Sequence, residues 1–230
     1  MSHVLDNMIW NALTTGNRDI AILNGDVAHY RPDIAPFAGM KVFNEENLSI
    51  LYEMIPAGRK VAIHSLAKKI DHDERKWKLV QHMDVTQMVY ERPVNSYISR
   101  NSEKIVPLTD EHIPQMLELT ALTKPGPFLQ RTIEFGNYFG IFVDGRLAGM
   151  AGQRMHPEPY LEVSAVCTHP DFRGQGYAKA CMLHIMKLIV DRNFIPFLHV
   201  LTNNTGAIQL YEDIGYDKRI ELIVDVVEKL

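Results

Sequence analysis

The second half of the chain alternates two hydrophobic patterns. Short apolar runs are followed by longer stretches in which apolar residues recur every three or four positions. The short runs predict strands, and the longer stretches predict helices. The predicted strands span residues 105–108, 138–143, 146–150, 160–168, 197–201 and 221–227. The predicted helices span residues 110–119, 176–192 and 205–214. Asp144-Gly145, between two of the strands, is typical of a two-residue hairpin turn.

The first half is less regular but also mixed. It predicts strands over residues 19–23, 60–64, 76–81 and 85–90, and helices over 6–13 and 45–55. Asn44 precedes the second helix and is a favourable N-cap residue. A polar stretch at 91–103, which contains Pro, Asn and Ser, predicts a linker. We therefore expect a smaller N-terminal α+β domain over residues 1–100 and a second domain over residues 101–230.

Composition narrows the class of protein. The chain has 230 residues, of which 46% are hydrophobic and 23% charged, as in ordinary globular proteins. A formal net charge of −4 disfavours a nucleic-acid partner, because such proteins are usually basic. Two cysteines are too few for a disulfide framework, and neither they nor the histidines have the spacing of a metal site. With no signal-peptide pattern and no membrane-length apolar run, we expect a cytoplasmic protein without a membrane partner.

Candidate chemistry is concentrated between the strand that ends near residue 168 and the helix that begins near 176. The intervening residues, His-Pro-Asp-Phe-Arg-Gly-Gln-Gly, contain two glycines that allow a ligand to approach the backbone closely. The start of a helix presents free N–H groups and a positive dipole end, which suits a phosphate. The segment lacks the Gly-Lys-Ser/Thr of a P-loop and the third glycine of a dinucleotide-binding fingerprint.

The segment instead fits R-x-x-G-x-A at Arg173, Gly176 and Ala178, and Asn204 to Tyr216 fits N-x-x-A-x-x-L-Y-x-x-x-G-Y. With both motifs in place, residues 104–230 resemble the GNAT superfamily of acyl-coenzyme A-dependent N-acetyltransferases. The resemblance implies an α+β fold whose twisted, mixed and mainly antiparallel sheet is flanked by helices. It also implies a V-shaped opening that holds the coenzyme between the strands ending at Thr168 and starting near Phe197. The first hundred residues more loosely resemble the extra N-terminal domain of two-part members, a degenerate copy without the coenzyme loop.

The resemblance implies that acetyl-CoA, the acyl donor, is held largely by backbone groups. The pyrophosphate would bind the loop residues Arg173, Gly174, Gln175, Gly176, Tyr177, Ala178 and Lys179. The pantetheine arm would pair with the strand at Val166, Cys167 and Thr168, and Asn204 would contact the coenzyme while it caps a helix. The Val166 N–H is the expected oxyanion donor, a role worth roughly 3–4 kcal/mol.

Two side chains are candidate catalytic groups. Tyr211 matches the tyrosine of the family's Leu-Tyr pair and is expected to return a proton to the departing thiolate. Glu162, eleven residues before Arg173, is the candidate base for the acceptor amine, directly or through a water. The alternative for Glu162 is a charge that reaches solvent or an arginine. Period-two alternation would place Glu162 and Val166 on the same face of their strand.

The function expected from the resemblance is acetyl transfer to an amine, directly within a ternary complex. A small-molecule acceptor is favoured, with loops 123–128 and 155–160 at the rim of its pocket. A protein acetyltransferase that acts on N-termini or lysines is one alternative, and a non-catalytic acyl-CoA sensor is another. A covalent acyl-cysteine is disfavoured, because Cys167 and Cys181 are expected to be buried as small hydrophobes. The expected partners are acetyl-CoA and an amine, in a monomer or homodimer.

Overall fold

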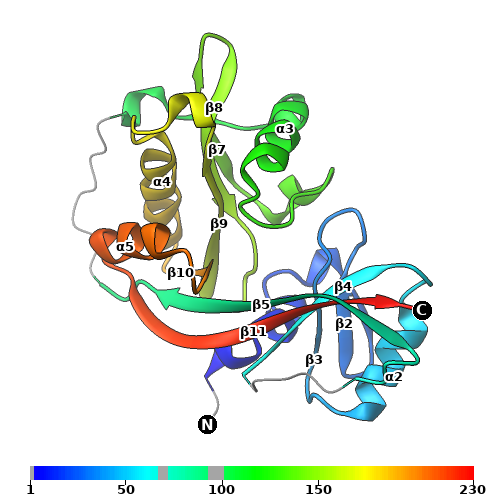
Figure 1. Cartoon of the computed structure of the whole chain (residues 1–230). Helices are drawn as coiled ribbons and strands as arrows, with labels where there is room; N and C mark the ends of the chain where they lie inside the picture. The colour runs from blue at the N-terminus through cyan, green and yellow to red at the C-terminus, as the bar shows by residue number, and fades with distance from the viewer. Residues whose placement is uncertain (1–2, 67–71, 93–100) are drawn as a thin grey trace.

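The computed structural model describes residues 3–66, 72–92 and 101–230, and these form an eight-stranded and a three-stranded sheet with flanking helices (Figure 1). The larger sheet has the strand order β4-β11-β5-β10-β9-β8-β7-β6. Its strands are β4 Lys60–Ser65, β5 Trp77–Val89, β6 Val106–Pro107, β7 Tyr138–Val143, β8 Arg146–Gln153, β9 Tyr160–Thr168, β10 Ile195–Leu201 and β11 Asp217–Lys229. Neighbouring strands are antiparallel except β9 and β10, which are parallel. The predicted α+β fold with a mixed, mainly antiparallel sheet is therefore confirmed.

The smaller sheet and the helices complete the fold. The smaller sheet contains β1 Ala21–Asn24, β2 Val27–Tyr30 and β3 Ala38–Met40. The α-helices are α1 Met8–Thr14, α2 Glu45–Met54, α3 Ile113–Thr123, α4 Tyr177–Asp191 and α5 Thr205–Ile214. Short 3-10 turns include η1 Val4–Asn7 and η6 Pro170–Phe172. Helices α4 and α5 lie on one side of β9 and α3 lies on the other (Figure 1).

Local sequence signals located several elements accurately. Strand β9 and helix α5 have the predicted bounds, and Asn44 caps α2 by accepting a 2.8 Å hydrogen bond from the Asn47 N–H. The hairpin β7–β8 turns at Asp144 and Gly145, whose φ angles are +49° and +76°. Such positive φ values at both positions are what a tight hairpin turn needs, and Asp-Gly provides them readily.

Other strands differ from the prediction, because pairing between distant parts of the chain determined them more than the local hydrophobic pattern did. The two strands predicted over 76–81 and 85–90 are one continuous strand, β5, because β11 pairs with it along its whole length. Strands β2 and β3 were not predicted, since runs of four and three residues carry little periodicity. The predicted strand over 19–23 begins as a 3-10 turn at Arg18–Ile20, and only β1 follows it as strand.

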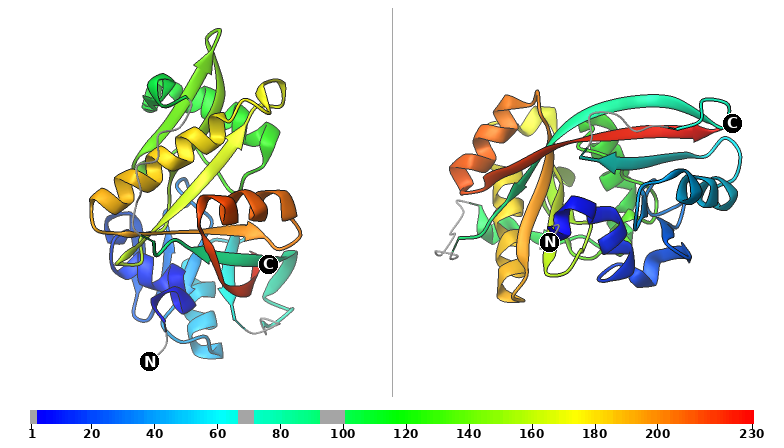
Figure 2. Two further views of the ribbon diagram at one scale, coloured as in Figure 1. Left: turned by 90° about the vertical axis from the view of Figure 1, so that its left-hand side faces the viewer. Right: turned by 90° about the horizontal axis from the view of Figure 1, so that it is seen from below.

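The two halves of the chain follow one plan and exchange their last strands. Each half has an antiparallel run of three strands, then a crossover helix, then a fourth strand: β1-β2-β3-α2-β4 and β7-β8-β9-α4-β10. Each then contributes one 13-residue strand, β5 or β11. Strand β5 of the first half lies between β10 and β11, and β11 lies between β4 and β5. The right-hand view of Figure 2 shows the two long strands side by side.

The boundary expected near residue 100 lies between β5 and β6, and the predicted linker falls partly on residues 93–100, which lie outside the described residues. The eight-stranded sheet contains strands from both sides of that boundary. The division into domains 1–100 and 101–230 stays a prediction about folding units. Because β5 and β11 pair along their full lengths, the halves share one sheet.

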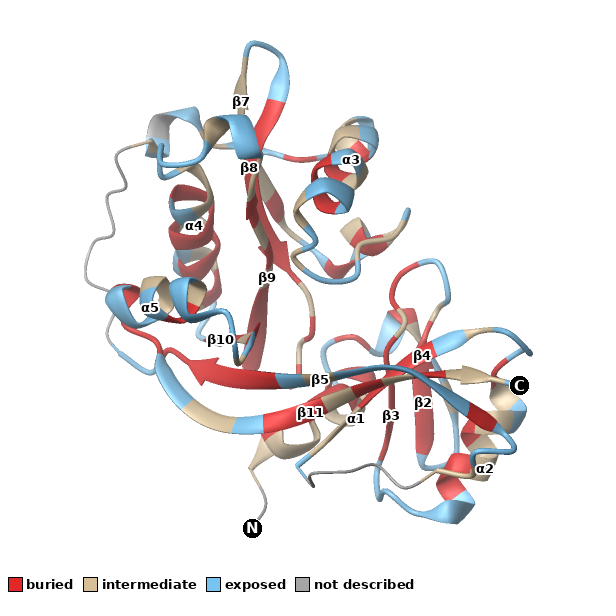
Figure 3. Cartoon of the chain, in the orientation of Figure 1, coloured by how far each residue is buried: buried red, intermediate tan, exposed pale blue. Residues whose placement is uncertain are grey.

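Buried residues lie along the central strands and on the helices that flank them (Figure 3). One apolar cluster packs α4 and α5 against β9 and β10, and a second packs η1 and α1 between the halves. Smaller clusters lie beneath α2 and α3. Within the described ranges, no helix is both long and apolar enough to cross a membrane.

Candidate active site

The parallel strands β9 and β10 pair for only three residues and then separate. Ile195 to Phe197 pair with Tyr160 to Glu162, after which β10 follows β5 and β9 follows β8. The strands therefore diverge from the Glu162–Phe197 pair toward the C-terminal ends at Thr168 and Leu201. This V-shaped opening lies where the sequence resemblance located it.

A β-bulge interrupts β9 on one arm of the V. Met150 and Gly152 of β8 pair with Cys167 and Ser164, so β9 contains one extra residue, and Ala165 has φ +53°. A bulge shifts side-chain alternation by one position. Val166 accordingly packs in the cluster beneath α4 and α5, while Cys167 packs in the cluster with α3. The expectation that Val166 shares a face with Glu162 and Ser164 is therefore wrong.

The glycine-containing loop follows the open end of β9. Gly174 and Gly176 have φ +78° and +76°, values in the left-handed region that favours glycine. Gly176 is the N-cap of α4, and no side chain caps the first N–H groups of the helix. Arg173, Gly174, Gln175, Gly176 and Lys179 are exposed, and Tyr177 and Ala178 are half-buried. An exposed helix start without a side-chain cap is suited to bind an anion.

The start of α4 is held firmly against β8. A Cβ atom added at Gly149 of β8 would lie 3.0 Å from Tyr177 Cβ and 3.3 Å from the Ala178 nitrogen. A side chain at Gly149 would require the helix start to shift by a few tenths of an ångström, so glycine allows the closer approach. Next to the helix start, the Asn101 side chain donates a 2.9 Å hydrogen bond to the Gln175 carbonyl. The loop is thus fixed at both its strand side and its outer side.

Helix α5 places Tyr211 and Asn204 near the V. Tyr211 packs, together with Val166 and Tyr177, on the cluster between the helices and the sheet. Burial, with a smaller contribution from nearby Cys167, raises the pKa of Tyr211 to about 12. The phenol is therefore protonated at neutral pH. Asn204 Oδ1 accepts a 3.2 Å hydrogen bond from the Ala207 N–H, which confirms that Asn204 caps α5.

Glu162 is completely buried at the apex of the V, and both of its carboxylate oxygens are paired. Arg154 donates to them from Nε at 2.7 Å and from Nη2 at 2.6 Å, and His199 Nδ1 lies 2.7 Å from Oε1. Burial alone would raise the pKa of Glu162, but the charge and hydrogen bonds of Arg154, with His199, lower it to about 2. Of the two readings of Glu162, this geometry favours the pairing with an arginine over a free base.

Sequence reasoning did not identify Arg154 or His199. His199 carries the same signal that singled out Glu162, a polar side chain within an apolar strand. Arg154 has no such signal, because it follows the last residue of β8 and its partner lies on another strand.

Both cysteines are buried, as expected of small hydrophobic side chains. Burial raises the pKa of each thiol to about 12, which keeps it protonated and a poor nucleophile at neutral pH. In the part of the chain that the structure describes, no three His, Cys, Asp or Glu side chains are placed to hold a metal ion.

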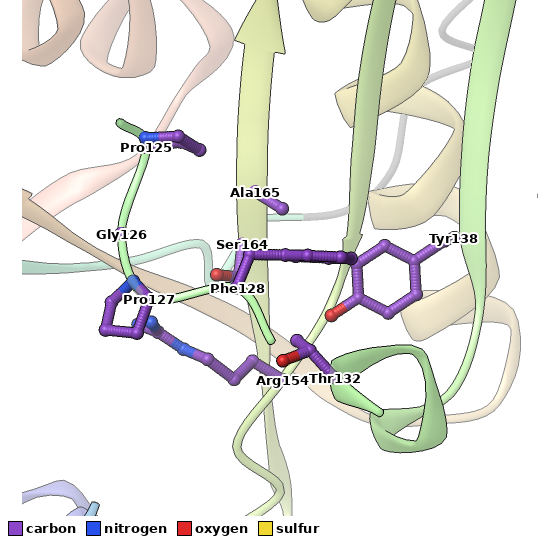
Figure 4. Close-up of a pocket in the computed structure, with 9 residues that line it drawn as sticks. All are labelled: Pro125, Gly126, Pro127, Phe128, Thr132, Tyr138, Arg154, Ser164 and Ala165. Carbon is purple, nitrogen blue, oxygen red and sulfur yellow. The ribbon is translucent and has the colours of Figure 1, made fainter. Parts of the chain in front are cut away.

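A shallow pocket lies on the face of β9 opposite α4, beside the bulge (Figure 4). One wall is the loop Pro125–Phe128, which belongs to the rim predicted from the sequence. Ser164 and Ala165 of β9, with Arg154, Tyr138 and Thr132, form the rest of the lining. The pocket therefore joins the bulged arm of the V to the Glu162–Arg154 pair.

Comparison with known proteins agrees with this geometry. The sequence profile of the Acetyltransferase (GNAT) family matches residues 107–216. Over 83 residues the chain is 32% identical to mycothiol acetyltransferase of Thermomonospora curvata, a match that covers 34% of this chain and only 28% of that protein.

Two solved structures show the fold over the whole chain. An assigned GNAT-family acetyltransferase from Novosphingobium aromaticivorans is 28% identical, with a TM-score of 0.91 and coverage of 100% of both chains. A GCN5-related N-acetyltransferase from Kribbella flavida has a TM-score of 0.59 at 10% identity, covering 96% of this chain and 95% of that one, and supports the fold alone.

Proposed function

We propose that this chain, whose residues 107–216 belong to the acetyltransferase (GNAT) family, transfers an acetyl group from acetyl-CoA to an amine of a small molecule. One observation carries the proposal: β9 and β10 separate into a V, and helix α4 begins at the open end of this V without a side-chain cap. The V offers unpaired strand edges to an amide-containing arm, and the helix start offers N–H groups to a pyrophosphate.

In this proposal the chain binds the coenzyme mainly through its backbone. The N–H groups of residues 174–179 hold the pyrophosphate, and exposed Arg173 and Lys179 add positive charge. The edge of β9 from Val166 to Thr168 pairs with the pantetheine arm, and Asn204 contacts the coenzyme from the start of α5. Acetyl-CoA, when bound, supplies the thioester that the amine attacks.

Two groups of this chain act on the reacting atoms. The Val166 N–H, which follows the bulge, donates a hydrogen bond to the thioester oxygen as negative charge develops there. Tyr211 donates its proton to the departing sulfur, a step for which its raised pKa of about 12 keeps the phenol protonated. Neither step uses Cys167 or Cys181. The amine nitrogen bonds to the acetyl carbon as the carbon–sulfur bond breaks, within a ternary complex. The amine releases its proton to water, and Tyr211 regains its proton from water.

A small-molecule acceptor is supported by two observations. Beside the bulge, the loop Pro125–Phe128 lies across a shallow hollow from Ser164 and Ala165 of β9, which leaves little open surface for a long segment of polypeptide. The relative from Thermomonospora curvata is named mycothiol acetyltransferase, after a small molecule. We propose that the acceptor amine approaches along this face of β9, past Ser164 and the loop Pro125–Phe128.

A thermal-shift titration with acetyl-CoA, CoA, NAD and ATP tests the proposal. At about 100 times its Kd a ligand adds roughly 2.7 kcal/mol of stability, which raises Tm by roughly 5–10 °C for a chain of this length. We expect this rise with the two coenzyme A species and not with NAD or ATP. No rise with acetyl-CoA, in a folded sample free of retained ligand, would remove the basis of the proposal. Release of free thiol with a panel of amines then separates an enzyme from a sensor.

A further inference from the structure

A row of buried polar side chains crosses the sheet beneath the apex of the V. It begins with the ion pair between Arg154, which follows β8, and Glu162 of β9, and it continues to His199 on β10. His199 Nε2 lies 3.0 Å from Gln87 Nε2 on β5, and Arg219 on β11 donates from Nε to Gln87 Oε1. Arg219 also pairs with Asp6 of η1. The row thus connects four adjacent strands with the N-terminal segment.

The row has only one consistent arrangement of hydrogens. Arginine can only donate, so Arg219 fixes the oxygen of Gln87 on its own side and turns the amide nitrogen toward His199. The Gln87 amide nitrogen lies 3.3 Å from the Leu5 carbonyl, 3.4 Å from Met8 Sδ and 3.0 Å from His199 Nε2. An amide nitrogen cannot accept a hydrogen bond, so a proton on His199 Nε2 would point at Gln87 without an acceptor. The imidazole proton is therefore on Nδ1, from which it is donated to Glu162 Oε1 at 2.7 Å. Asp6 in turn orients Arg219.

The His199–Glu162 hydrogen bond lies at the point where the V begins. Glu162 forms the last residue pair between the two strands, and His199 is two residues beyond its partner Phe197. This side-chain hydrogen bond therefore connects β9 and β10 just beyond their last backbone pair. With exposed fractions of 8% for the His199 side chain and 0% for Glu162, water does not compete with it.

We propose that Gln87, Arg219 and Asp6 are positioning residues that hold His199 as a donor to Glu162 and thereby set the separation of β9 and β10 at the apex of the coenzyme cleft. The effect on coenzyme binding rests on the proposed function. Asp6 and Gln87 belong to the first half of the chain. In this arrangement the first half therefore helps to shape the binding site of the second half. Glu162 and His199 act through the shape of the cleft, not by contact with the reacting atoms.

Nitrogen-15 NMR of the imidazole rings tests the hydrogen arrangement without any coenzyme. The His199 signals, among ten histidines, are assigned by their loss in His199→Asn. We expect a protonated Nδ1 and an unprotonated Nε2 in the wild type. Gln87→Glu keeps the shape and the Arg219 contact but presents only acceptors, so Nε2 should gain a proton. Gln81→Glu, an exposed substitution on the same strand, should leave the His199 signals unchanged. A protonated Nε2 in the wild type, or unchanged signals in Gln87→Glu, would overturn the arrangement.

Calorimetric titration with CoA tests the effect on the cleft. His199→Phe removes the donor to Glu162, and we expect the Kd for CoA to rise about tenfold, or about 1.4 kcal/mol. His199→Asn retains an N–H donor near the position of Nδ1 and should restore the Kd to within about threefold of the wild type. If His199 had only a structural role, both variants would have a lower Tm, but their Kd values for CoA would not differ from each other in this way. Wild-type affinity in a folded His199→Phe protein would refute the positioning role.

The two proposals fail in different ways. If the wild type does not bind CoA, the proposed function is wrong, whatever the NMR spectra show. If the wild type binds CoA and His199→Phe binds it equally well, the function stands and only the positioning role is lost.

Discussion

Helices α2 and α4 occupy equivalent places in the two halves but begin in different ways. Helix α2 connects β3 to β4, and α4 connects β9 to β10. In the second half β9 and β10 pair in parallel over three residues, and in the first half a single parallel bridge joins Phe37, just before β3, to Ala62 of β4. At the start of α4 Gly176 provides no side-chain cap. At the start of α2 the Asn44 side chain caps the helix, and Glu45 and Glu46 follow it. Carboxylates and a side-chain cap oppose an anion at α2, whereas α4 is open to one.

The residues at the point where the two strands separate also differ between the halves. In the second half the last pair contains Glu162, and His199 follows two residues beyond it. In the first half the single parallel bridge joins Phe37 to Ala62, and His64 follows two residues beyond it. Burial lowers the pKa of His64 to about 4, and its Nε2 contacts the Asp6 carbonyl at 3.1 Å. The first-half apex thus contains Phe37, Ala62 and a neutral His64, and η1 and α1 line its groove of about 600 Å³.

The comparison teaches that a shared backbone plan does not determine binding. A short parallel contact is present in both halves, but the groups at the helix start decide whether a phosphate is attracted. We infer that the first half has kept the frame of a coenzyme cleft and now supports the second half, through β5 and the Asp6–Arg219 pair. Substitutions that make one cleft resemble the other can test this.

The largest expected effect comes from giving α4 an acidic first turn like that of α2. Ala178→Glu places a carboxylate about 5 Å from the proposed pyrophosphate, a repulsion of about 3 kcal/mol at an effective dielectric constant of about 20. The Kd for CoA should rise at least about a hundredfold in calorimetric titration. Ala178→Gln is the control of equal size and should bind nearly as well as the wild type. Because a glutamate stabilises a helix start, Tm should not fall.

A second substitution removes the carboxylate from the second-half apex and leaves Arg154 without its partner. Glu162 has a pKa of about 2, below its ordinary value of 4.5. Its contribution to stability, about 3 kcal/mol, is therefore complete above about pH 4.5 and is lost as the pH falls toward 2. Glu162→Gln should remove this contribution at pH 7 and flatten the pH dependence of urea unfolding over that range. Glu158→Gln, an exposed neighbour, should behave as the wild type.

The same Glu162→Gln protein also decides between the two readings of this residue. Glutamine still accepts a hydrogen bond from His199 but cannot take a proton from the amine. If Glu162 is the base, the rate will fall most at neutral pH and recover at high pH, where free amine is plentiful. If Glu162 acts through the shape of the cleft, the rate will change by a similar factor at every pH.

The residues that sequence reasoning located are those whose signal is local. Gly176, Tyr211 and Asn204 stand in motifs of closely spaced positions, and β9 and α5 have clear periodicity. The Arg154–Glu162 pair depends on the antiparallel turn from β8 to β9, and the Gln87 contact joins residues 112 apart in the chain. The bulge at Ala165 was equally inaccessible, because alanine is not a residue that signals a positive φ. Tertiary pairing, not local preference, determined these features.

Tyr211 has no counterpart in the described residues of the first half, where β4 is not followed by a described helix. Tyr211→Phe should lower kcat about a hundredfold, the usual contribution of a general acid, and leave the Kd for CoA nearly unchanged. Because burial raises the pKa of Tyr211 to about 12, the wild-type rate should not fall between pH 7 and 10 through loss of this proton. Equal turnover of Tyr211→Phe and wild type with any competent amine would exclude the role.

The smallest effect compares the two asparagine caps directly. Asn44 and Asn204 each accept one hydrogen bond from the third residue of their helix, so either alanine substitution should cost about 1 kcal/mol and lower Tm by about 2–4 °C. Only Asn204→Ala should also weaken CoA binding, because Asn204 is proposed to contact the coenzyme and Asn44 is not. A similar loss of affinity in Asn44→Ala would mean that the first half also contacts the coenzyme, and the contrast between the two clefts would fail.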